Sequence, residues 1–421
     1  MEEFNNSFDG LASEIRCAAN PIELTEVQLH EPASTNQQAA SALQQMEAGF
    51  KVDLSALARL DKNYREGLIG LHQYLQEKLQ ARFRPNSNQE LAELLFHKFS
   101  LPPLLKTPGG SNSISITVLE RLGKSYADTY PLLRTIIKFK RLYTLSKSTK
   151  VIFKKLDSKG RVHPEFNQTS CPTGRIYSYI QNLPKEVRKV LIPDAEENAF
   201  IELDWSQQEL RILAALSQEP VFLDCFTRNE DLHQRVISEM FHKPISEVTE
   251  EERKVGKTIN YALIYGQEGP GLAWKLNIPL KKAKELIGQY FSSLPMIQKF
   301  KDESKKKFLT ESYAETAFGR KTRLDLTGPN KERELRRAFN HIIQGTGADI
   351  LRMTLVKLNE ALTGRGTTLK FCSHDAIYLE AKKDAVQGAG ELAKLIMEIN
   401  FMGVRLPVTM KIHHDFSMGE G

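Results

Sequence analysis

Apolar residues recur at helical spacing along most of the chain. Stripes of apolar positions opposite charged faces predict helices over residues 42–83, 90–101 and 117–156, and a longer helical region over 208–308 that is interrupted near 241–252 and 266–271. Further helices are predicted over 331–362 and 385–399. Residues 1–41 are polar and include a turn-rich stretch, which predicts a linker.

Period-two alternation appears in only a few places. A short strand is predicted to end at Asp204, a hairpin is predicted over 370–381 with Ser373, His374 and Asp375 at its tip, and a last strand lies within 406–416. The order of these elements is helices, a strand, more helices, and then helices with strands. This order predicts an α+β protein in which a helical region is inserted between strands of one sheet.

Composition narrows the class of protein. The chain has 421 residues, of which 41% are hydrophobic and 26% charged, and these values are typical of globular proteins. Its net charge of +6 suits a polyanionic partner without demonstrating one. No apolar run approaches the roughly 20 residues that cross a bilayer, and no secretion signal is present. We therefore expect a soluble, cytoplasmic protein with no membrane partner.

The cysteines predict neither a disulfide framework nor a zinc site. They stand at positions 17, 171, 225 and 372, and no two of them have the spacing of a Cys-x-x-Cys motif. Scattered cysteines of this kind are typical of proteins that remain in a reducing compartment.

The two aspartates at strand ends are candidates for a metal site. A sheet that pairs the strand ending at Asp204 with the hairpin carrying Asp375 would place two carboxylates side by side. Magnesium prefers oxygen ligands and commonly takes one or two carboxylates, with water and substrate phosphates as the rest. Either aspartate alone would more often be a cap or turn residue.

A second candidate is the helical stripe Arg253, Lys257, Tyr261 and Tyr265. These residues stand four apart, so they wind slowly around one helix face over roughly 18 Å. Two cations followed by two aromatic rings match a triphosphate, a sugar and a base. An exposed basic face with buried tyrosines explains the same spacing about equally well.

Two further regions are ambiguous when taken alone. Residues 166–184 hold amides, hydroxyls and Arg175 in a turn-rich segment that suits nucleic-acid contacts, and equally suits an ordinary polar loop. The dense lysines between 138 and 155 are most simply a solvated helix face.

The motifs together resemble those of family A DNA polymerases, the bacterial DNA polymerase I family. The stretch "LDWSQQELRILAALSQEP" resembles the first catalytic motif, "RKVGKTINYALIYG" the nucleotide-binding helix, and "SHDAIYLE" the second catalytic motif. The stretches "DLHQRVISEMF", "AFGRKTR" and "RRAFNHIIQGTGADI" are also similar to the family. The resemblance runs from about residue 42 to 419 and keeps the family's order of motifs.

The resemblance implies an α+β right-hand polymerase fold, with an antiparallel-sheet palm, helical fingers and a helical thumb. It implies an N-terminal extension of unknown role at 1–41, a thumb and helical base at 42–160, a first palm segment at 161–207, fingers at 208–330 and a second palm segment at 331–421. The lysine-rich helices would then contact duplex phosphates.

The resemblance also implies roles for individual residues. Asp204 and Asp375 would bind two Mg²⁺ ions, which Mn²⁺ can replace, and Lys257 would protonate the leaving pyrophosphate. The residues implied to bind the incoming deoxynucleotide (dNTP) are Arg253, Lys257, Tyr261, Tyr265, His233, Gln207 and Glu209, the last of which would exclude a 2′-hydroxyl. The residues implied to contact primer and template DNA are Arg175, Gln181, Asn182, Arg336, Asn340, Gln344 and His374.

The sequence departs from the family at several positions. Ala376 stands where the family usually has Glu, which predicts a slower or more metal-demanding enzyme because a carboxylate beside the metal ligands typically contributes about 10–100-fold. Trp205 replaces a residue that is usually Tyr. The segment between Arg175 and Gln181 is shorter than in most relatives. Tyr261 stands where many relatives have Phe, and this predicts ready incorporation of dideoxynucleotides.

Three hypotheses follow. The first is a monomeric DNA-templated DNA polymerase that uses primer-template DNA, dNTPs and unknown accessory proteins, and that lacks proofreading because no acidic exonuclease motif precedes the thumb-like region. The second is an RNA polymerase or reverse transcriptase of related fold. Glu209 argues against the use of ribonucleotides, while the choice of template stays open. The third is a DNA-binding homologue that is weakened or inactive at Ala376, against which the otherwise intact motif residues argue.

Overall fold

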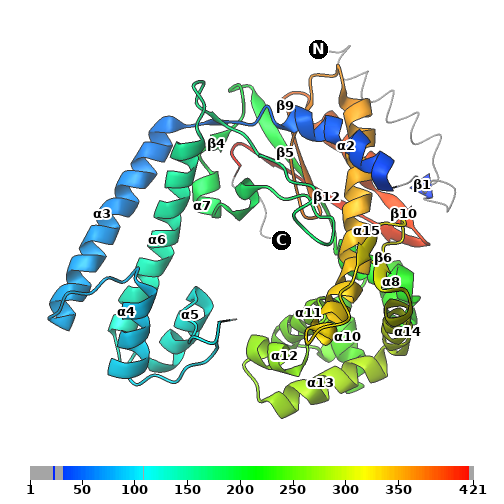
Figure 1. The fold of residues 1–421 in the computed structure, drawn as a ribbon. Helices are drawn as coiled ribbons and strands as arrows, with labels where there is room; N and C mark the ends of the chain where they lie inside the picture. The colour runs from blue at the N-terminus through cyan, green and yellow to red at the C-terminus, as the bar shows by residue number, and fades with distance from the viewer. Residues whose placement is uncertain (1–21, 24–31, 108, 417–421) are drawn as a thin grey trace. The chain divides into compact units, whose positions relative to one another are not determined.

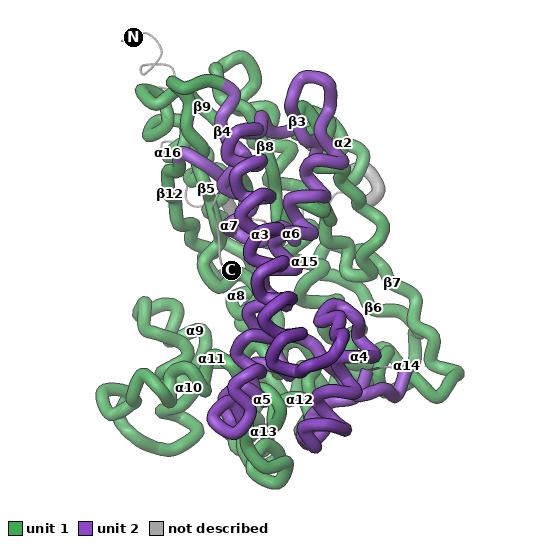
Figure 2. Tube along the Cα trace, turned by 90° about the vertical axis from the view of Figure 1, so that its left-hand side faces the viewer, with its two compact units in different colours: residues 1–48, 164–181, 195–413 green, residues 49–163, 182–194, 414–421 purple. Residues whose placement is uncertain are grey.

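The computed structural model describes residues 22–23, 32–107 and 109–416. The chain divides into two compact units (Figure 2). Unit 1 comprises residues 1–48, 164–181 and 195–413, and unit 2 comprises residues 49–163, 182–194 and 414–421. Each unit combines helices with antiparallel strands, so the expected α+β class is confirmed.

A four-stranded antiparallel sheet forms the centre of unit 1 (Figure 1). Its strand order is β12 (Val408–His413), β5 (Asn198–Trp205), β9 (Ala376–Lys382) and β8 (Thr368–Ser373). Ile201, Leu203 and Trp205 alternate along β5 and are fully or almost fully buried. Helix α16 (Val386–Met397) packs on β5, β9 and β12. The apolar face of the sheet thereby becomes part of the core, as the alternation of apolar residues predicts.

The chain between β5 and β8 is mostly helical. It comprises α8 (Gln208–Ser217), α9 (Pro220–Thr227), α10 (Leu232–Phe241), the short η4 (Ile245–Glu247), α11 (Glu250–Ile264), α12 (Gly269–Leu276), α13 (Leu280–Ser293), α14 (Pro295–Glu311), the hairpin of β6 (Tyr313–Glu315) and β7 (Lys321–Arg323), and α15 (Lys331–Leu362). The predicted helical insertion is therefore present, and its two predicted interruptions fall at η4 and between α11 and α12.

Helix α2 (Pro32–Met46) belongs to unit 1, where it packs on α15 and β8. Its Asn36 Oδ1 accepts a hydrogen bond of 3.0 Å from Arg320 Nη2. Strand β1 (Ile22–Glu23) pairs in parallel with β10 (Ile399–Phe401), which pairs in turn with β11 (Val404–Leu406). Helical structure therefore begins ten residues before the expected start at residue 42, within the segment that was expected to be a linker.

Unit 2 is built on two long helices, α3 (Leu54–Leu79) and α6 (Leu132–Lys155), which pack along each other. The shorter helices are α4 (Asn88–Ala92), the π-helical η2 (Glu93–Lys98), α5 (Ile116–Tyr126) and α7 (Lys185–Arg188). A small antiparallel sheet orders β3 (Arg161–Val162), β2 (Phe50–Val52) and β4 (Leu191–Ile192).

The helix expected over 42–83 is in fact two helices separated by β2. Gly49 explains the break, because its φ of +73° is a left-handed conformation and a Cβ there would lie 2.2 Å from the Val162 carbonyl oxygen. Pairing of β4 with β2 also places residues 182–194 in unit 2. Two of the unit boundaries fall near residues 48 and 163.

Among the described residues, no helix is both long enough and apolar enough to cross a membrane.

Candidate functional site

The two predicted metal-binding aspartates lie at one edge of the unit 1 sheet, Asp204 near the end of β5 and Asp375 in the turn between β8 and β9. Asp204 is the next-to-last residue of β5 and pairs in register with Ala376, the first residue of β9. Asp375 precedes Ala376 in the hairpin tip, and its carbonyl accepts a 3.1 Å hydrogen bond from the Trp205 amide. The expected pairing of these strand ends is therefore present, and it comes from antiparallel register between segments 171 residues apart in sequence.

Electrostatics at this pair favour a bound cation. Burial raises the pKa of Asp204 to about 7, and the charges of Asp375 and Glu202 add to the effect. Burial likewise raises the pKa of Asp375. Asp204 Oδ1 is buried and has no hydrogen-bond partner among the described residues. Because a buried carboxylate oxygen without a donor is costly, this arrangement fits an oxygen-preferring divalent cation.

Ala376 occupies the position that a third carboxylate would need. It lies directly opposite Asp204, so the two side chains project from the same face of the sheet, with Cβ atoms about 5 Å apart. Ala376 is 6% exposed. On the other side of Asp204, its register partner is Thr409 on β12. The family's usual Glu at 376 would therefore stand next to Asp204.

Glu209 is the centre of a group of predicted site residues. It lies in the first turn of α8, is 7% exposed, and forms an ion pair with Arg175. Burial raises its pKa, whereas the Arg175 charge and hydrogen bonding with Tyr265 and Gln344 oppose the rise. The charge of Asp375 also raises the pKa of Glu209. The structure thus brings four predicted nucleotide- or DNA-binding residues together within electrostatic range of Asp375.

Helix α11 carries the predicted nucleotide-binding stripe. Its N-terminus has a capping box between Thr249 and Glu252. Tyr261 and Tyr265 stack with ring centroids 6.4 Å apart. Burial raises the pKa of Tyr261 to about 12, with further contributions from the charges of Glu209, Asp375 and Asp204. The aromatic end of the stripe therefore lies within electrostatic range of the carboxylate pair.

The cationic end of the stripe lies beside α10. Arg253 forms an ion pair with Asp231, and Lys257 is exposed. His233 is 3% exposed, and its Nδ1 lies 3.0 Å from Asn260 Nδ2. Burial lowers the pKa of His233 to about 4, so the imidazole is neutral at pH 7. With Nδ1 accepting from Asn260, the ring proton is on Nε2, where it is available to an acceptor.

Other predicted site residues are less closely grouped. Gln207 precedes α8 in a left-handed conformation with φ of 56°, and its Oε1 is buried without a described partner. Asn340 Oδ1 is likewise buried without a described hydrogen-bond partner. Arg336 forms a 3.0 Å ion pair with Glu268. Unsatisfied buried amides are uncommon in proteins, and those of Gln207 and Asn340 are suited to ligand contacts.

The hairpin tip and the segment after Arg175 hold the remaining predicted residues. His374 is exposed and left-handed, with φ of 55°, and partial burial of its ring together with the Arg175 charge lowers its pKa. Gln181 and Asn182 end a short 3-10 helix, η3 (Tyr179–Asn182), at the boundary between the two units. Gln181 belongs to unit 1 and Asn182 to unit 2.

The residue-by-residue predictions missed several neighbours of the site. Asp231 forms an ion pair with Arg253, and Asn260 lies within hydrogen-bond distance of His233. The charge of Glu202 helps to raise the pKa of Asp204. Asp231 stands immediately before an amphipathic helix, which is a recognisable N-cap signal. No sequence signal predicts that Asp231 also pairs with Arg253, because that contact depends on how α10 packs against α11.

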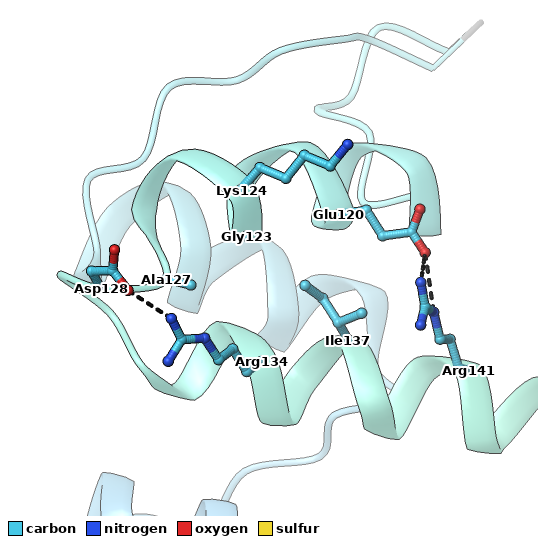
Figure 3. A pocket seen from close by; sticks show the side chains of 8 residues that line it. All are labelled: Glu120, Gly123, Lys124, Ala127, Asp128, Arg134, Ile137 and Arg141. Carbon is cyan, nitrogen blue, oxygen red and sulfur yellow. Dashed lines mark hydrogen bonds and ion pairs between the residues drawn. The ribbon is translucent and has the colours of Figure 1, made fainter.

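A separate cavity of about 570 Å³ lies in unit 2 between α5 and α6 (Figure 3). Gly123, Ala127 and Ile137 are among its lining residues, and an ion pair closes each end, Glu120 with Arg141 and Asp128 with Arg134. Four of its five charged lining residues are paired with each other, and Lys124 is the fifth.

Comparison with solved structures identifies the class of fold. The structure described as "POL domain of Pol1 from M. smegmatis complex with DNA primer-template and dNTP" matches with a TM-score of 0.84 and 26% sequence identity. The match covers 91% of this chain and 70% of that chain. The fold is therefore that of a polymerase domain, which confirms the expected right-hand polymerase fold.

The chain belongs to DNA polymerase family A, because the sequence model of that family matches residues 54–418. The chain is 32% identical over 396 residues to "DNA polymerase I, thermostable" of Thermus aquaticus, covering 90% of this chain and 47% of that protein. It is 30% identical over 398 residues to "DNA polymerase I" of Geobacillus stearothermophilus, covering 90% and 44%. The chain thus spans just under half the length of these relatives.

Proposed function

We propose that this protein is a DNA-templated DNA polymerase that adds dNTPs to a primer 3′-hydroxyl. The observation that supports the proposal best is the paired carboxylates of Asp204 and Asp375, with raised pKa values and a buried oxygen that lacks a donor. Family membership and the likeness to a polymerase domain in complex with primer-template DNA and dNTP support the same activity. The palm, fingers and thumb would follow the domain ranges implied by the sequence motifs.

Asp204 and Asp375 would hold divalent cations, Mg²⁺ or Mn²⁺, with phosphate and water oxygens completing the coordination. When bound, such ions stabilise negative charge on the attacking and leaving oxygens. In the reaction, the primer 3′-hydroxyl loses its proton to water and its oxygen bonds to the α-phosphorus of the dNTP, while the bond from that phosphorus to the leaving oxygen breaks. Lys257, exposed on α11, would donate a proton to the pyrophosphate.

The residues around the carboxylates would select and orient the nucleotide. Arg253 and the neutral His233 would donate hydrogen bonds to the triphosphate, and Tyr261 would stack on the incoming base. Glu209, held by Arg175 and buried, would occupy the space beside the sugar and so exclude a 2′-hydroxyl. The Tyr261 hydroxyl would replace the sugar 3′-hydroxyl interaction, so we expect dideoxynucleotides to be incorporated within about tenfold of dNTPs.

We further propose that these 421 residues carry no 3′–5′ exonuclease activity, because no acidic exonuclease motif precedes the thumb-like region in the sequence. A mismatched primer end should therefore persist when it is incubated with pure protein and without dNTPs. Shortening of that primer would contradict this part of the proposal.

Primer extension tests the proposal directly. A 5′-labelled primer on a DNA template is incubated with Mg²⁺ and either dNTPs or ribonucleotides, and Glu209→Ala serves as a second enzyme. We expect extension of the primer by the wild type with dNTPs, and a gain of ribonucleotide use in the variant. Efficient ribonucleotide use by the wild type would favour an RNA polymerase instead.

The alternative function is a DNA-binding homologue without catalysis, which Ala376 favours because a carboxylate beside Asp204 is missing. Binding of primer-template without extension, in either Mg²⁺ or Mn²⁺, would support that alternative.

A further inference from the structure

Asp231 uses its two carboxylate oxygens for two different contacts. Its Oδ1 caps α10 by accepting a 3.0 Å hydrogen bond from the Gln234 amide. Its Oδ2 accepts from Arg253 Nε at 2.9 Å and from Arg253 Nη2 at 2.7 Å. The cap fixes the Asp231 side chain to α10, whereas Arg253 belongs to α11. The ion pair therefore ties a guanidinium on one helix to a carboxylate anchored on another.

This contact restricts the position of the Arg253 guanidinium. An unrestrained arginine side chain loses rotamer entropy when it binds a ligand. The other acid near Arg253 is Glu250, on the same helix, 56% exposed and 3.4 Å from Nη1. Because Glu250 is exposed and more distant, Asp231 is the contact that determines where the guanidinium lies. Two N–H groups bond Asp231 and one on Nη1 bonds Glu250, which leaves two of the five for phosphate oxygens.

We propose that Asp231 is a positioning residue for nucleotide binding: it holds the Arg253 guanidinium in the orientation that receives the triphosphate of the incoming dNTP. This inference rests on the proposed function, and it adds a residue that contacts neither substrate nor metal. Asp231 also stands two residues before His233, so the first turn of α10 supports both predicted phosphate donors.

A competing effect has the opposite sign and makes the proposal testable. The Asp231 charge repels a triphosphate, so its removal would strengthen dNTP binding if electrostatics alone mattered. If Asp231 instead positions Arg253, removing its carboxylate should weaken dNTP binding. Asp231→Ser keeps an N-cap residue on α10 but cannot reach Arg253, and Asp231→Asn keeps the cap and the size while removing the charge. Both variants should therefore fold, and both separate the two effects.

The experiment measures equilibrium binding of the dNTP that pairs with the templating base. The full chain is used, on primer-template DNA whose primer ends in a dideoxynucleotide so that no bond can form. We expect D231S to raise the Kd about tenfold and D231N between about twofold and tenfold. Glu250→Ser is the matched control, and it should stay within about twofold of the wild type.

A double-mutant cycle with Arg253→Ala shows whether Asp231 acts through Arg253. The D231S/R253A protein should bind dNTP within about twofold of R253A alone, since the two changes remove the same interaction. Additive losses would overturn the proposal, as would tighter binding by D231S and D231N. If R253A itself binds like the wild type, the proposed triphosphate site fails. If R253A weakens binding while D231S does not, only the role of Asp231 fails.

Discussion

Restoring a carboxylate at position 376 should make the stability of the protein depend on divalent cations. Ala376 lies directly opposite Asp204 on the same sheet face, so an introduced Glu would stand beside two carboxyl groups whose pKa values are already raised. At a charge separation of about 6 Å and an effective dielectric constant of about 20, each like-charge pair costs about 3 kcal/mol. Partial protonation and movement of the Glu side chain reduce this to about 1–3 kcal/mol in total.

The neutral isostere Ala376→Gln isolates the charge, because it adds the same bulk to a site that is 6% exposed. Both variants lose some stability from overpacking, about 1–3 kcal/mol. In chelator, A376E should unfold several degrees below A376Q. With saturating Mg²⁺ the difference should vanish or reverse, since ions that bind only the folded protein stabilise it by mass action.

Thermal unfolding followed by circular dichroism, with and without Mg²⁺, provides the comparison. Equal unfolding temperatures for A376E and A376Q in both conditions would refute the claim that position 376 lies within electrostatic range of a cation site. In primer extension, A376E should need less Mg²⁺ for half-maximal rate than the wild type does.

Three other predictions concern unit 1. A Cβ at Gly256 would lie 2.4 Å from the His233 carbonyl oxygen, so Gly256→Ala should lower the free energy of unfolding by about 1–3 kcal/mol and weaken dNTP binding. The control is Gly288→Ala, whose added Cβ meets nothing within 4 Å and which should be neutral or stabilising in the same unfolding assay. Burial raises the pKa values of Cys225 and Cys372 to about 12, so iodoacetamide at pH 8 should modify Cys171 and spare these two in peptide mass spectrometry; rapid labelling of Cys372 would contradict its burial. The pKa of His233 falls from 6.5 to about 4 on folding, so the unfolded chain binds this proton more tightly, and the contribution of His233 to stability should be lost as pH falls from about 6.5 to 4. Wild type should therefore lose more stability than His233→Gln over that range, and parallel unfolding curves would be inconsistent with a neutral, buried imidazole.

The sequence predicts the carboxylate pair because its signal is local. Alternation marks β5 and the β8–β9 hairpin, and a charged residue at the end of each apolar strand locates Asp204 and Asp375. Pairing of the two strands then follows from the need to bury both apolar faces against one core. The α11 stripe is predictable for the same reason, since its spacing lies within one helix.

The remaining features depend on contacts between distant segments. Strands β2, β3 and β4 have two or three residues each, which is too short for alternation to be visible. The break at Gly49 depends on the close approach of Val162, and the ion pair of Asp231 with Arg253 depends on helix packing. Single-segment patterns carry no information about such contacts.

Single-turnover incorporation of one dNTP into a primer-template tests whether Asp204 and Asp375 carry nucleotidyl transfer. Wild type is compared with Asp375→Asn and with Ser373→Ala as a neighbouring control, after equal DNA binding has been established for all three. We expect incorporation by wild type and S373A, and a loss of at least about 10³-fold in D375N. Incorporation by D375N at the wild-type rate would contradict this role of Asp375.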